Sequence, residues 1–425
     1  MRKMNREFLR ERINSLYPDR KILEVSTLND RPFPEALERI HEGTMSDLDR
    51  LDVLCKNGEG TFPLSLLCKQ YHRADKGDLR DEVTLFQFYN RIFEGYGDRT
   101  PFPTILDHSL RQRALLREFV PGITLAEAFL HFHRLISNRR KDISRIPRNS
   151  PEGMVVRREY ERLQRNKEIL KKAVIGTLAT IHHHGTENIT QLQTSWTGFQ
   201  RYKVDRPTVQ YYVDDFADHF RNVLERMCSQ EILPFSSKEV TDRKEAVSRA
   251  FADTPLAPYF EKADDTLILG DAHPENFIIL GTCPLEEDPL YLGAEAQITP
   301  HSLTPRVKCI DLGKGRVGVA ASDLADLLNY PGFIEGEVTG HDWSRRTHID
   351  SYVEKKGSLE DRTLSYNEGI ACHTGVHYFS IIRAMHAADV DERNSPYYLK
   401  ILQREITSDR ELLKLEEALS DLFVH

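Results

Sequence analysis

The hydrophobic pattern of this 425-residue chain changes character near residue 120. Before that point, apolar residues occur in short runs between turn-forming residues, which is typical of an antiparallel meander. Beyond Thr124 they recur mostly at helical spacing, and the expected helices are 124–136, 152–184, 208–230, 237–252, 343–356, 364–387 and 396–423. Strand-like runs interrupt them at 266–269, 277–280 and 307–310. The pattern therefore predicts an α+β protein, with a small β-rich part and a larger helical part.

Turns and prolines suggest where these parts begin and end. We expect residues 1–35 to form a helical extension, closed by a linker at Pro32 and Pro34. Residues 36–121 would form the β-rich lobe and residues 122–425 the helical lobe. Within the β-rich lobe, strands are expected near 37–41, 48–55 and 62–71, with turns at 42–46 and 56–60.

Composition limits the class of protein. With 29% charged and 40% hydrophobic residues the chain has an ordinary globular composition, and its formal charge of −8 argues against a nucleic-acid partner. The six cysteines are scattered singly, without metal-ligand spacing, so a reducing, cytoplasmic location is expected. No signal-peptide core and no run of eighteen apolar residues is present, so no transmembrane segment is expected.

One stretch is strongly basic despite the overall negative charge. Residues 134–172 contain thirteen Lys and Arg against five Asp and Glu, a local excess of 13 − 5 = +8. This pattern suits a solvated helical hairpin, and it also suits contact with an anionic partner. Both interpretations stay open from sequence.

A carboxylate lies on the apolar face of an expected helix. In "LRDEVTLFQFYNRIF", residues 79–93, Glu82 shares one helical stripe with Phe86, Tyr89 and Phe93. An unpaired buried carboxylate is costly, so Glu82 should have a cationic partner. Several nearby basic residues could supply it, among them Lys69, Lys76 and Arg80, and Asp81 could take the place of Glu82 in the pair.

The stretch "LILGDAHPENFIIL", residues 267–280, places a polar heptad between two apolar runs. Asp271 and Asn276 lie on this loop, and Asp311 ends a later strand in "VKCIDLGKGRVG". Carboxylate and carboxamide oxygens at strand ends suit Mg²⁺ that also binds phosphate oxygens. Asp271 would then remain to orient an acceptor hydroxyl, as in phosphoryl transfer. Taken alone, Asp271 would more simply cap a turn.

These two motifs, G-D-x-H-P-x-N and I-D-x-G, resemble the catalytic and metal-binding loops of the aminoglycoside phosphotransferase and choline kinase group. The members of this group are small-molecule relatives of the protein kinases. The resemblance implies a bilobal protein-kinase-like fold, with a small antiparallel β N-lobe carrying one helix and a large, mainly helical C-lobe. It also implies ATP and Mg²⁺ as cofactors and a small-molecule acceptor.

The resemblance assigns roles to individual residues in and around these two loops. Asp271 matches the catalytic aspartate, while Asn276 and Asp311 match the metal ligands. His273 would brace the catalytic loop, and so would Asp323, which lies 323 − 311 = 12 residues after Asp311.

Further matches lie in the β-rich part. Lys69, in "FPLSLLCKQYHR", stands where a lysine touches the α- and β-phosphates, and Glu82 becomes its helix partner. Gly43, in "HEGTMSD", occupies the nucleotide-loop position, although an ordinary hairpin turn explains it equally well. Backbone groups from Glu118 to Val120 would meet the adenine edge.

Departures from the family pattern keep other functions open. Leu269 stands where a histidine usually precedes the Gly-Asp pair, and residues 281–306 are an insertion. A catalytically silent kinase-like nucleotide-binding protein is one alternative, and a protein kinase is another. The short spacing to Asp323 and the lack of an A-P-E motif favour a small-molecule acceptor over a protein.

Two remaining patterns bear on ligands. Residues 209–220 mix tyrosines and aspartates, which suits a cationic amine but also the acidic outer face of an amphipathic helix. His182, His183 and His184 precede Gly185, and consecutive helical residues point about 100° apart. We therefore expect a fraying helix end there and not a metal site.

Overall fold

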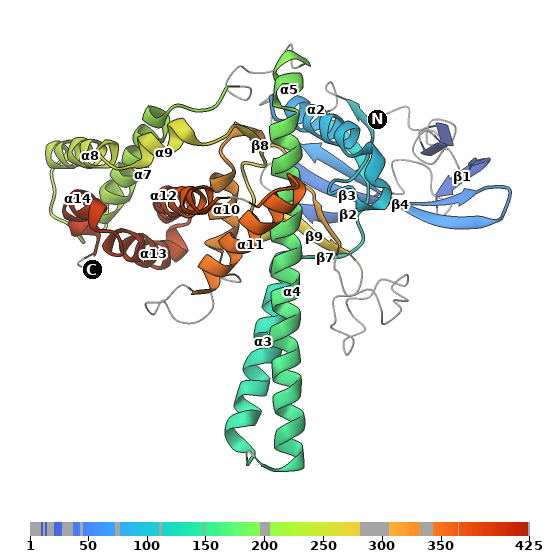
Figure 1. The fold of residues 1–425 in the computed structure, drawn as a ribbon. Helices are drawn as coiled ribbons and strands as arrows, with labels where there is room; N and C mark the ends of the chain where they lie inside the picture. The colour runs from blue at the N-terminus through green and yellow to red at the C-terminus, as the bar shows by residue number, and fades with distance from the viewer. Residues whose placement is uncertain are drawn as a thin grey trace. The chain divides into compact units, whose positions relative to one another are not determined.

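The computed structural model describes residues 10–11, 13–14, 21–27, 37–42, 46–72, 77–109, 113–147, 149–195, 205–280, 306–330, 333, 343–363 and 365–423. These residues form two compact units (Figure 1). The first takes in the described parts of Met1–Ala128 and Glu275–Gly315, and the second those of Phe129–Thr197, Arg201–Pro274 and Arg316–His425. The first unit contains an antiparallel sheet with one long helix and the second is mainly helical, as the α+β prediction states.

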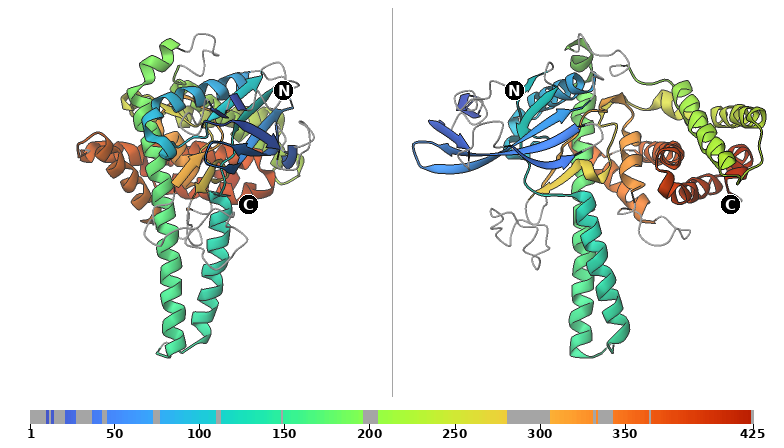
Figure 2. Two further views of the ribbon diagram at one scale, coloured as in Figure 1. Left: turned by 90° about the vertical axis from the view of Figure 1, so that its right-hand side faces the viewer. Right: turned by 180° about the vertical axis from the view of Figure 1, so that it is seen from behind.

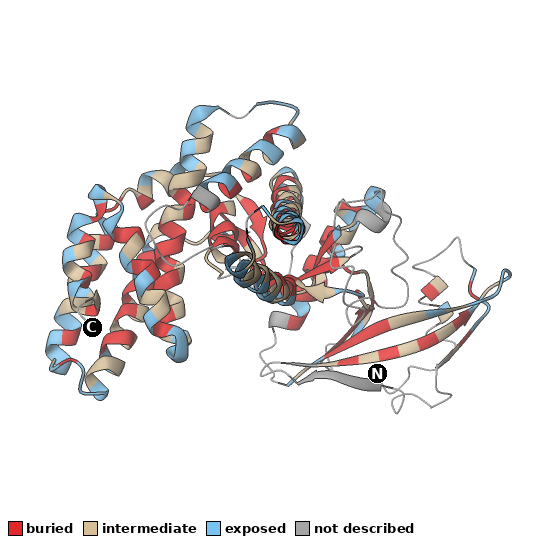
Figure 3. Ribbon diagram, turned by 90° about the horizontal axis from the view of Figure 1, so that it is seen from below, coloured by how far each residue is buried: buried red, intermediate tan, exposed pale blue. Residues whose placement is uncertain are grey.

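The first unit is built on a six-stranded antiparallel sheet. Its strands run in the order β1-β3-β4-β6-β5, and β2 pairs with β3 off this path. Their bounds are β1 Glu24–Thr27, β2 Leu37–Glu42, β3 Ser46–Lys56, β4 Thr61–Tyr71, β5 Ile105–Ser109 and β6 Ala114–Glu118. Figure 3 colours the residues by burial. Along β3, buried and less buried residues alternate from Leu48 to Lys56, because successive side chains point to opposite faces.

Strand β1 corrects the expectation of an all-helical extension at residues 1–35. Arg10–Glu11 and Ile13–Asn14 are helical, but Glu24–Thr27 pairs antiparallel with β3. Val25 is 3% exposed and belongs to the core on one sheet face with Val53 and Cys55. Burial of this side chain and the backbone ladder to β3 therefore draw the segment into the sheet.

The expected turn at residues 56–60 joins β3 to β4. The Asn57 side chain accepts hydrogen bonds from the backbone N–H groups of Glu59 and Gly60, each at 3.0 Å. Gly60 has a φ of 154°, a backbone conformation that glycine adopts without a Cβ penalty. This local chemistry sets the hairpin register that runs from Lys56↔Thr61 to Ser46↔Tyr71.

Helix α2, Gly77–Ile92, places its aromatic residues on the buried side, as the stripe predicts. Phe86, Tyr89 and Phe93 are all 0% exposed. The ring of Tyr89 stacks on Phe102 with centroids 4.2 Å apart, and Phe86 meets the same ring edge-on at 6.1 Å. The short 3₁₀ helix η2, Glu94–Arg99, follows directly.

A second, three-stranded sheet explains why residues 275–280 and 306–315 belong to the β-rich unit. From sequence they were expected in the helical lobe, 122–425. Strand β9, Phe277–Leu280, pairs with both β7, Ile123–Thr124, and β10, Arg306–Cys309. Gly122 permits this pairing, since a Cβ there would lie 2.3 Å from the Ile279 carbonyl oxygen. The ladder hydrogen bonds to β7 thus decide the grouping.

The second unit contains most of the helices. They are α3 Leu125–Arg145, α4 Pro151–Glu187, α5 Ile189–Ser195, α7 Val209–Ser229, α8 Ser237–Ala252, α9 Leu256–Lys262, α10 Ala320–Leu328, α11 Trp343–Leu359, α12 Tyr366–Val390, α13 Ser395–Thr407 and α14 Leu413–Phe423. The 3₁₀ turns η5 Glu392–Asn394 and η6 Arg410–Leu412 also belong to this unit, while η3 Pro274–Asn276 spans the boundary between the two units in sequence.

The C-terminal segment differs from the single helix expected over 396–423. It forms α13 and α14, separated by the 3₁₀ turn η6. The side chain of Asp409 accepts a hydrogen bond from the Glu411 backbone N–H at 2.9 Å. Such a side-chain cap competes with the helical backbone pattern and so favours a break at this point.

Helices α3 and α4 form the hairpin expected for the basic stretch at 134–172, and Figures 1 and 2 show them side by side. Ser150 caps the N-terminus of α4 by accepting from the Gly153 N–H at 3.0 Å. Arg139 on α3 pairs with Glu159 on α4 at 2.8 Å and with Asp142 at 3.3 Å. Some of the positive charge is therefore neutralised within the hairpin, and an anionic partner stays a prediction.

The two short strands β8, Thr266–Ile268, and β11, Arg316–Gly318, form an antiparallel pair beside α4. Gly185 lies where α4 approaches β8, because a Cβ there would come within 2.8 Å of Thr266 Oγ1 and 2.9 Å of Leu267 N. The expectation of a fraying helix end before Gly185 was wrong, since α4 continues to Glu187. Packing against β8 holds this last turn.

Within the described part of the chain, no helix combines the length and apolar character that crossing a bilayer requires.

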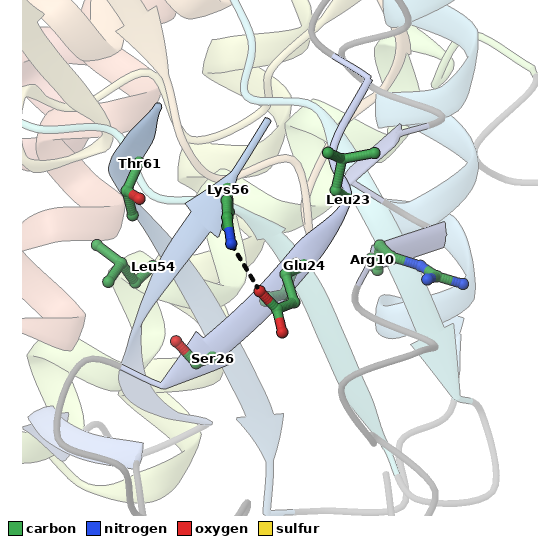
Figure 4. A pocket seen from close by; sticks show the side chains of 8 residues that line it. Arg10, Leu23, Glu24, Ser26, Leu54, Lys56 and Thr61 are labelled. Carbon is green, nitrogen blue, oxygen red and sulfur yellow. Dashed lines mark ion pairs between the residues drawn. The ribbon is translucent and has the colours of Figure 1, made fainter. Parts of the chain in front are cut away.

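A hollow of about 390 Å³ lies over β1 and the turn end of the β3–β4 hairpin (Figure 4), lined by Arg10, Leu23, Glu24, Val25, Ser26, Leu54, Lys56 and Thr61. Thr61 precedes Lys69 by eight strand residues, or about 26 Å, so this hollow is remote from the lysine that the sequence singles out.

Candidate active site

In the first unit, the strand lysine and the helix glutamate predicted to pair do so. Lys69 on β4 lies 3.2 and 3.1 Å from the two carboxylate oxygens of Glu82 on α2. Its Nζ also lies 3.2 Å from Asp311 Oδ2. The Lys69 side chain is 8% exposed and that of Glu82 0%, so this is a buried ion pair with one partly exposed carboxylate, Asp311, at its edge.

The electrostatics keep the lysine charged. Burial alone would lower the pKa of Lys69, but the carboxylates of Glu82 and Asp311 raise it above its ordinary value. Burial raises the pKa of Glu82, and the attraction of Lys69 opposes that shift. Burial would also raise the pKa of Asp311, yet Lys69 and a hydrogen bond from the Gly313 N–H lower it overall. Asp311 is therefore ionised at neutral pH.

Arg117 on β6 is a second buried cation in this region, and sequence reasoning missed it. It is 2% exposed, and its guanidinium lies 5.7 Å from the centre of the Phe86 ring. Its Nε and Nη1 atoms have no hydrogen-bond partner among the residues that the structure describes. Burial lowers the pKa of Arg117, while Glu82 and Asp311 oppose that shift. A basic residue in an apolar strand was the only available signal.

Asn276 and Asp311 are brought together by the small sheet. The register pairs Phe277 with Cys309, so Asn276 precedes one strand and Asp311 follows its neighbour at the same end. The Ile310 backbone N–H donates to the Asn276 carbonyl at 2.9 Å, which fixes the two loops side by side. Both residues were expected at strand ends, and the pairing of β9 with β10 makes those ends adjacent.

These two residues fit a magnesium ion that also takes phosphate oxygens. Together they offer carboxylate and carboxamide oxygens, the hard donors that Mg²⁺ prefers. The Asp311 side chain is 40% exposed, and Asn276 is 9% exposed. Asp311 Oδ1 accepts from the Gly313 N–H at 2.9 Å, which orients the carboxylate. The donor set is small, as expected where substrate and water complete the coordination.

At the expected hinge, the structure places Glu118 in contacts that the sequence did not suggest. Its carboxylate lies 3.0 and 3.1 Å from Lys308 Nζ. Its backbone N–H donates to the Thr104 carbonyl, and the N–H of Phe119 donates to Ser65. These two N–H groups are therefore occupied within the unit. Val120 is 8% exposed, and its backbone role toward an adenine stays a prediction.

In the second unit, Asp323 braces the loop that carries Asp271. Its two carboxylate oxygens accept from the backbone N–H groups of Leu269 at 2.6 Å and Gly270 at 2.9 Å. Gly270 has a φ of 72°, a left-handed conformation suited to glycine. Asp323 itself is 0% exposed on α10. The bracing contact therefore sets the backbone immediately before Asp271.

A histidine far away in sequence supports this brace. His182 on α4 places Nε2 3.0 Å from Asp323 Oδ2 and Nδ1 2.9 Å from the Tyr352 hydroxyl. Its backbone carbonyl accepts from Thr266 Oγ1 at 2.6 Å. Leu269, which departs from the family pattern, is itself buried at 0% exposure. The imidazole that contacts Asp323 therefore comes from α4.

Asp271 and His273 lie on the loop after Gly270. Their side chains are each 34% exposed, and His273 Nε2 is 3.9 Å from Asp271 Oδ1. The same unit contains a cation, Arg383 on α12, which forms an ion pair with Asp326 at 2.6 Å. Burial would lower the pKa of Arg383, but the carboxylates of Asp326, Asp323 and Asp271 raise it. The carboxylate of Asp271 therefore interacts electrostatically with the Arg383 guanidinium.

Two parts of the sequence analysis lie outside the described residues. These are Gly43, with its proposed nucleotide-loop role, and the insertion at 281–305. On α7, Tyr212 and Phe216 belong to the core while Asp214 is exposed. This arrangement favours the amphipathic-helix interpretation of residues 209–220 over a cationic-amine site.

Comparison with known proteins gives structural likeness only. No protein-family model and no curated protein matches the sequence. An ethanolamine kinase from Plasmodium vivax is 13% identical, with 93% of this chain and 84% of that chain covered and a TM-score of 0.42. A choline kinase from Streptococcus pneumoniae is 12% identical, with 99% of each chain covered and a TM-score of 0.37. A choline/ethanolamine kinase family protein from Mesorhizobium loti is 10% identical, with 96% of this chain and 99% of that chain covered and a TM-score of 0.38.

These solved structures are kinases of the kind that the sequence motifs resemble. At identities of 10–13% and TM-scores of 0.37–0.42, the function proposed below rests on the site residues and not on these likenesses.

Proposed function

We propose that this protein is an ATP-dependent phosphotransferase that moves a γ-phosphate to a hydroxyl group of a small molecule. The observation that carries the proposal is the buried Lys69 between Glu82 and Asp311. An ammonium held by one buried glutamate and one partly exposed aspartate suits phosphate binding next to a metal ion. A structural ion pair alone would not require the third, exposed carboxylate.

Each residue then has a distinct task. Mg²⁺, held by Asn276 and Asp311, would neutralise charge on the nucleotide phosphates. Lys69, kept protonated and positioned by Glu82, binds the α- and β-phosphates. Asp271 orients the acceptor hydroxyl and accepts its proton, on a loop whose backbone Asp323 holds.

The spacing along the chain is compatible with this division of tasks. Asn276 lies five positions after Asp271, and five extended residues span at most about 17 Å. A base and a metal ligand on one short loop can therefore serve one in-line transfer.

The test is phosphate transfer from labelled ATP into a cell metabolite extract, with separation of small products from protein. We expect a small molecule to gain label. Asp271→Asn should lower the turnover at least 100-fold while Mg-ATP binding, followed by thermal shift, persists. Asp242→Asn, at an exposed position on α8, is the matched control and should behave as the parent.

Other outcomes would replace the proposal. Binding of Mg-ATP without turnover over a wide panel of acceptors would support a catalytically silent nucleotide-binding protein. Label incorporated into protein would support a protein kinase. If neither binding nor transfer is found, or if Asp271→Asn retains full turnover, the proposed chemistry is wrong.

A further inference from the structure

Four polar side chains meet between α7 and α12 in the second unit, apart from the residues discussed above. Asp215 and His219 lie one turn apart on α7, and His386 and Asp389 lie on one face of α12. His386 Nδ1 is 2.7 Å from His219 Nε2, and the two rings are nearly perpendicular, with centroids 4.4 Å apart. Asp215 Oδ1 is 3.6 Å from the same His219 nitrogen.

The opposite edge of the His219 ring is held by a carboxylate. His219 Nδ1 lies 2.7 Å from Asp389 Oδ2, which also accepts from Asn222 Nδ2 at 2.9 Å. Because a carboxylate only accepts, Nδ1 carries the proton in this contact. In neutral His219, the Nε2 lone pair therefore faces His386 and Asp215. A carboxylate behind the imidazole is the arrangement by which metal-binding histidines are oriented.

Three ligand atoms converge on one point in front of this ring. His219 Nε2, His386 Nδ1 and a carboxylate oxygen of Asp215 all lie within 4.8 Å of one another. Ligands about 2.0–2.1 Å from a tetrahedral zinc ion lie about 3.3–3.4 Å apart. The two histidine nitrogens would therefore separate by little more than half an ångström to admit an ion.

The surroundings make the cluster stable enough to act as a site. His219 and Asp389 are largely buried, with side-chain exposures of 16% and 15%, and Asp215 at 33% leaves one side open to solvent. Arg226 on α7 donates to the backbone carbonyls of Ala388 and Asp389, which holds the end of α12 against α7. The ligands thus come from two packed helices and not from a mobile loop.

A second histidine cluster provides the comparison. His183, His184 and Glu187 also bring ligand atoms within 4.8 Å, but all three belong to the last turn of α4. There Glu187, 53% exposed, lies 3.4 Å from His183 and 3.2 Å from His184. Ordinary pairing of a surface glutamate with two histidines explains that contact.

We propose that Asp215, His219 and His386 bind a divalent transition-metal ion, with Asp389 as the positioning residue for His219. Two imidazole nitrogens and one carboxylate oxygen suit Zn²⁺ better than the oxygen-seeking Mg²⁺ or Ca²⁺. Water completes a four-coordinate site on the open side. The ion links α7 to α12, and the site is independent of the phosphotransfer proposed above.

The test uses full-length, tag-free protein that has been stripped of metal by a chelator. Calorimetric titration with Zn²⁺ should show one equivalent bound, and Co²⁺ should give the visible absorption of a tetrahedral nitrogen-oxygen site. Both signals should be lost in His219→Ala and His386→Ala. Asp389→Asn should weaken the binding about 10–100-fold, because the imidazole loses its orienting partner.

The control is the double variant His183→Ala/His184→Ala, which should bind Zn²⁺ as the parent does. Circular dichroism of each metal-free variant checks the fold, and the partly exposed Asp215→Asn replaces any histidine variant that does not fold, with weaker binding expected. The proposal is overturned if the parent binds no Zn²⁺, if the His219 and Asp215 variants bind it unchanged, or if only the control loses it. The cluster is then a hydrogen-bonded histidine pair.

Discussion

Lys69 illustrates how one side chain serves both stability and the proposed chemistry. It pairs with the fully buried Glu82, and it also contacts Asp311, where a nucleotide phosphate and a metal ion are proposed to bind. Removing one partner of a buried pair is costly because the other charge remains without compensation. Substitutions of Lys69 and of Glu82 can therefore separate its contribution to stability from its proposed role in phosphate binding.

We expect Lys69→Met to lower the free energy of unfolding by about 3–5 kcal/mol, because Glu82 is left buried and uncompensated. Denaturant unfolding followed by circular dichroism measures this loss. Adding Glu82→Gln should recover part of the stability, whereas binding of Mg-ATP should stay weak in both variants. Equal losses of stability in the single and double variants would contradict this account.

Arg117 shows the limit of reasoning from local pattern. It lies within the apolar strand "RALLREFV", and its charged side chain is 2% exposed. The cation is tolerated because it lies over the Phe86 ring and near the carboxylates of Glu82 and Asp311. This environment arises only when β6, α2 and β10 are packed together.

At the scale of elements, α4 does more than the amphipathic helix that its sequence predicts. It places His182 against Asp323 and Gly185 against β8, so one helix supports the loop that carries Asp271. The close approach at Gly185 is what brings Thr266 within 2.6 Å of the His182 carbonyl. Helix α4 and the β8–β11 strand pair therefore together hold the loop that carries Asp271.

This contact can be tested with two glycines of the same helix. Gly185→Ala should destabilise the protein by about 1–3 kcal/mol, because the new methyl group overlaps the Thr266 side chain and the Leu267 backbone. Gly176→Ala is the matched control, since its Cβ would meet only Lys355 Cγ at 4.0 Å. It should be neutral or stabilising by up to about 1 kcal/mol through helix propensity.

Thermal and denaturant unfolding of both variants measure these changes. Hydrogen exchange at Leu269 and Gly270 adds a local readout and should be faster in Gly185→Ala only. If both alanine variants have the same stability, the close approach of α4 to β8 does not contribute to the free energy of unfolding.

At the scale of the whole molecule, acid stability should depend on buried carboxylates such as Glu405. Its side chain is 6% exposed and contacts Arg345 at 2.7 Å, which joins α11 to α13. Burial would raise the pKa of Glu405, but Arg345, His377 and Arg404 lower it well below its ordinary value of 4.5. The folded state thus binds a proton less readily than the unfolded state.

The sign of the pH dependence follows from this difference. The stabilisation by Glu405 is complete above the unfolded pKa of about 4.5 and is lost as the pH falls toward the lower folded pKa. Glu405→Gln should lower the free energy of unfolding at pH 7 by about 3–5 kcal/mol, because Arg345 loses its partner. The further loss between pH 5 and pH 3 should be smaller than in the parent.

Denaturant unfolding at several pH values provides the measurement, and Glu417→Gln, at an exposed position on α14, is a control that should keep the parent's pH profile. An unchanged loss between pH 5 and pH 3 in Glu405→Gln would show that other carboxylates carry the acid sensitivity.

Much of the architecture could be predicted from local spacing. The β-rich region, the α2 stripe, the helical hairpin and the strand-end positions of Asn276 and Asp311 all follow from periodicity and turn chemistry, which act over a few residues. The need of Glu82 for a cation also follows from its place on an apolar face.

Only the tertiary structure decided which residues meet. It brought His182 to Asp323 across 141 positions of sequence and paired β9 with β7. It also placed His219 beside His386, which no spacing in the chain suggests. Periodicity encodes the direction in which a side chain points, whereas its partner depends on distances between segments that the folded backbone alone determines.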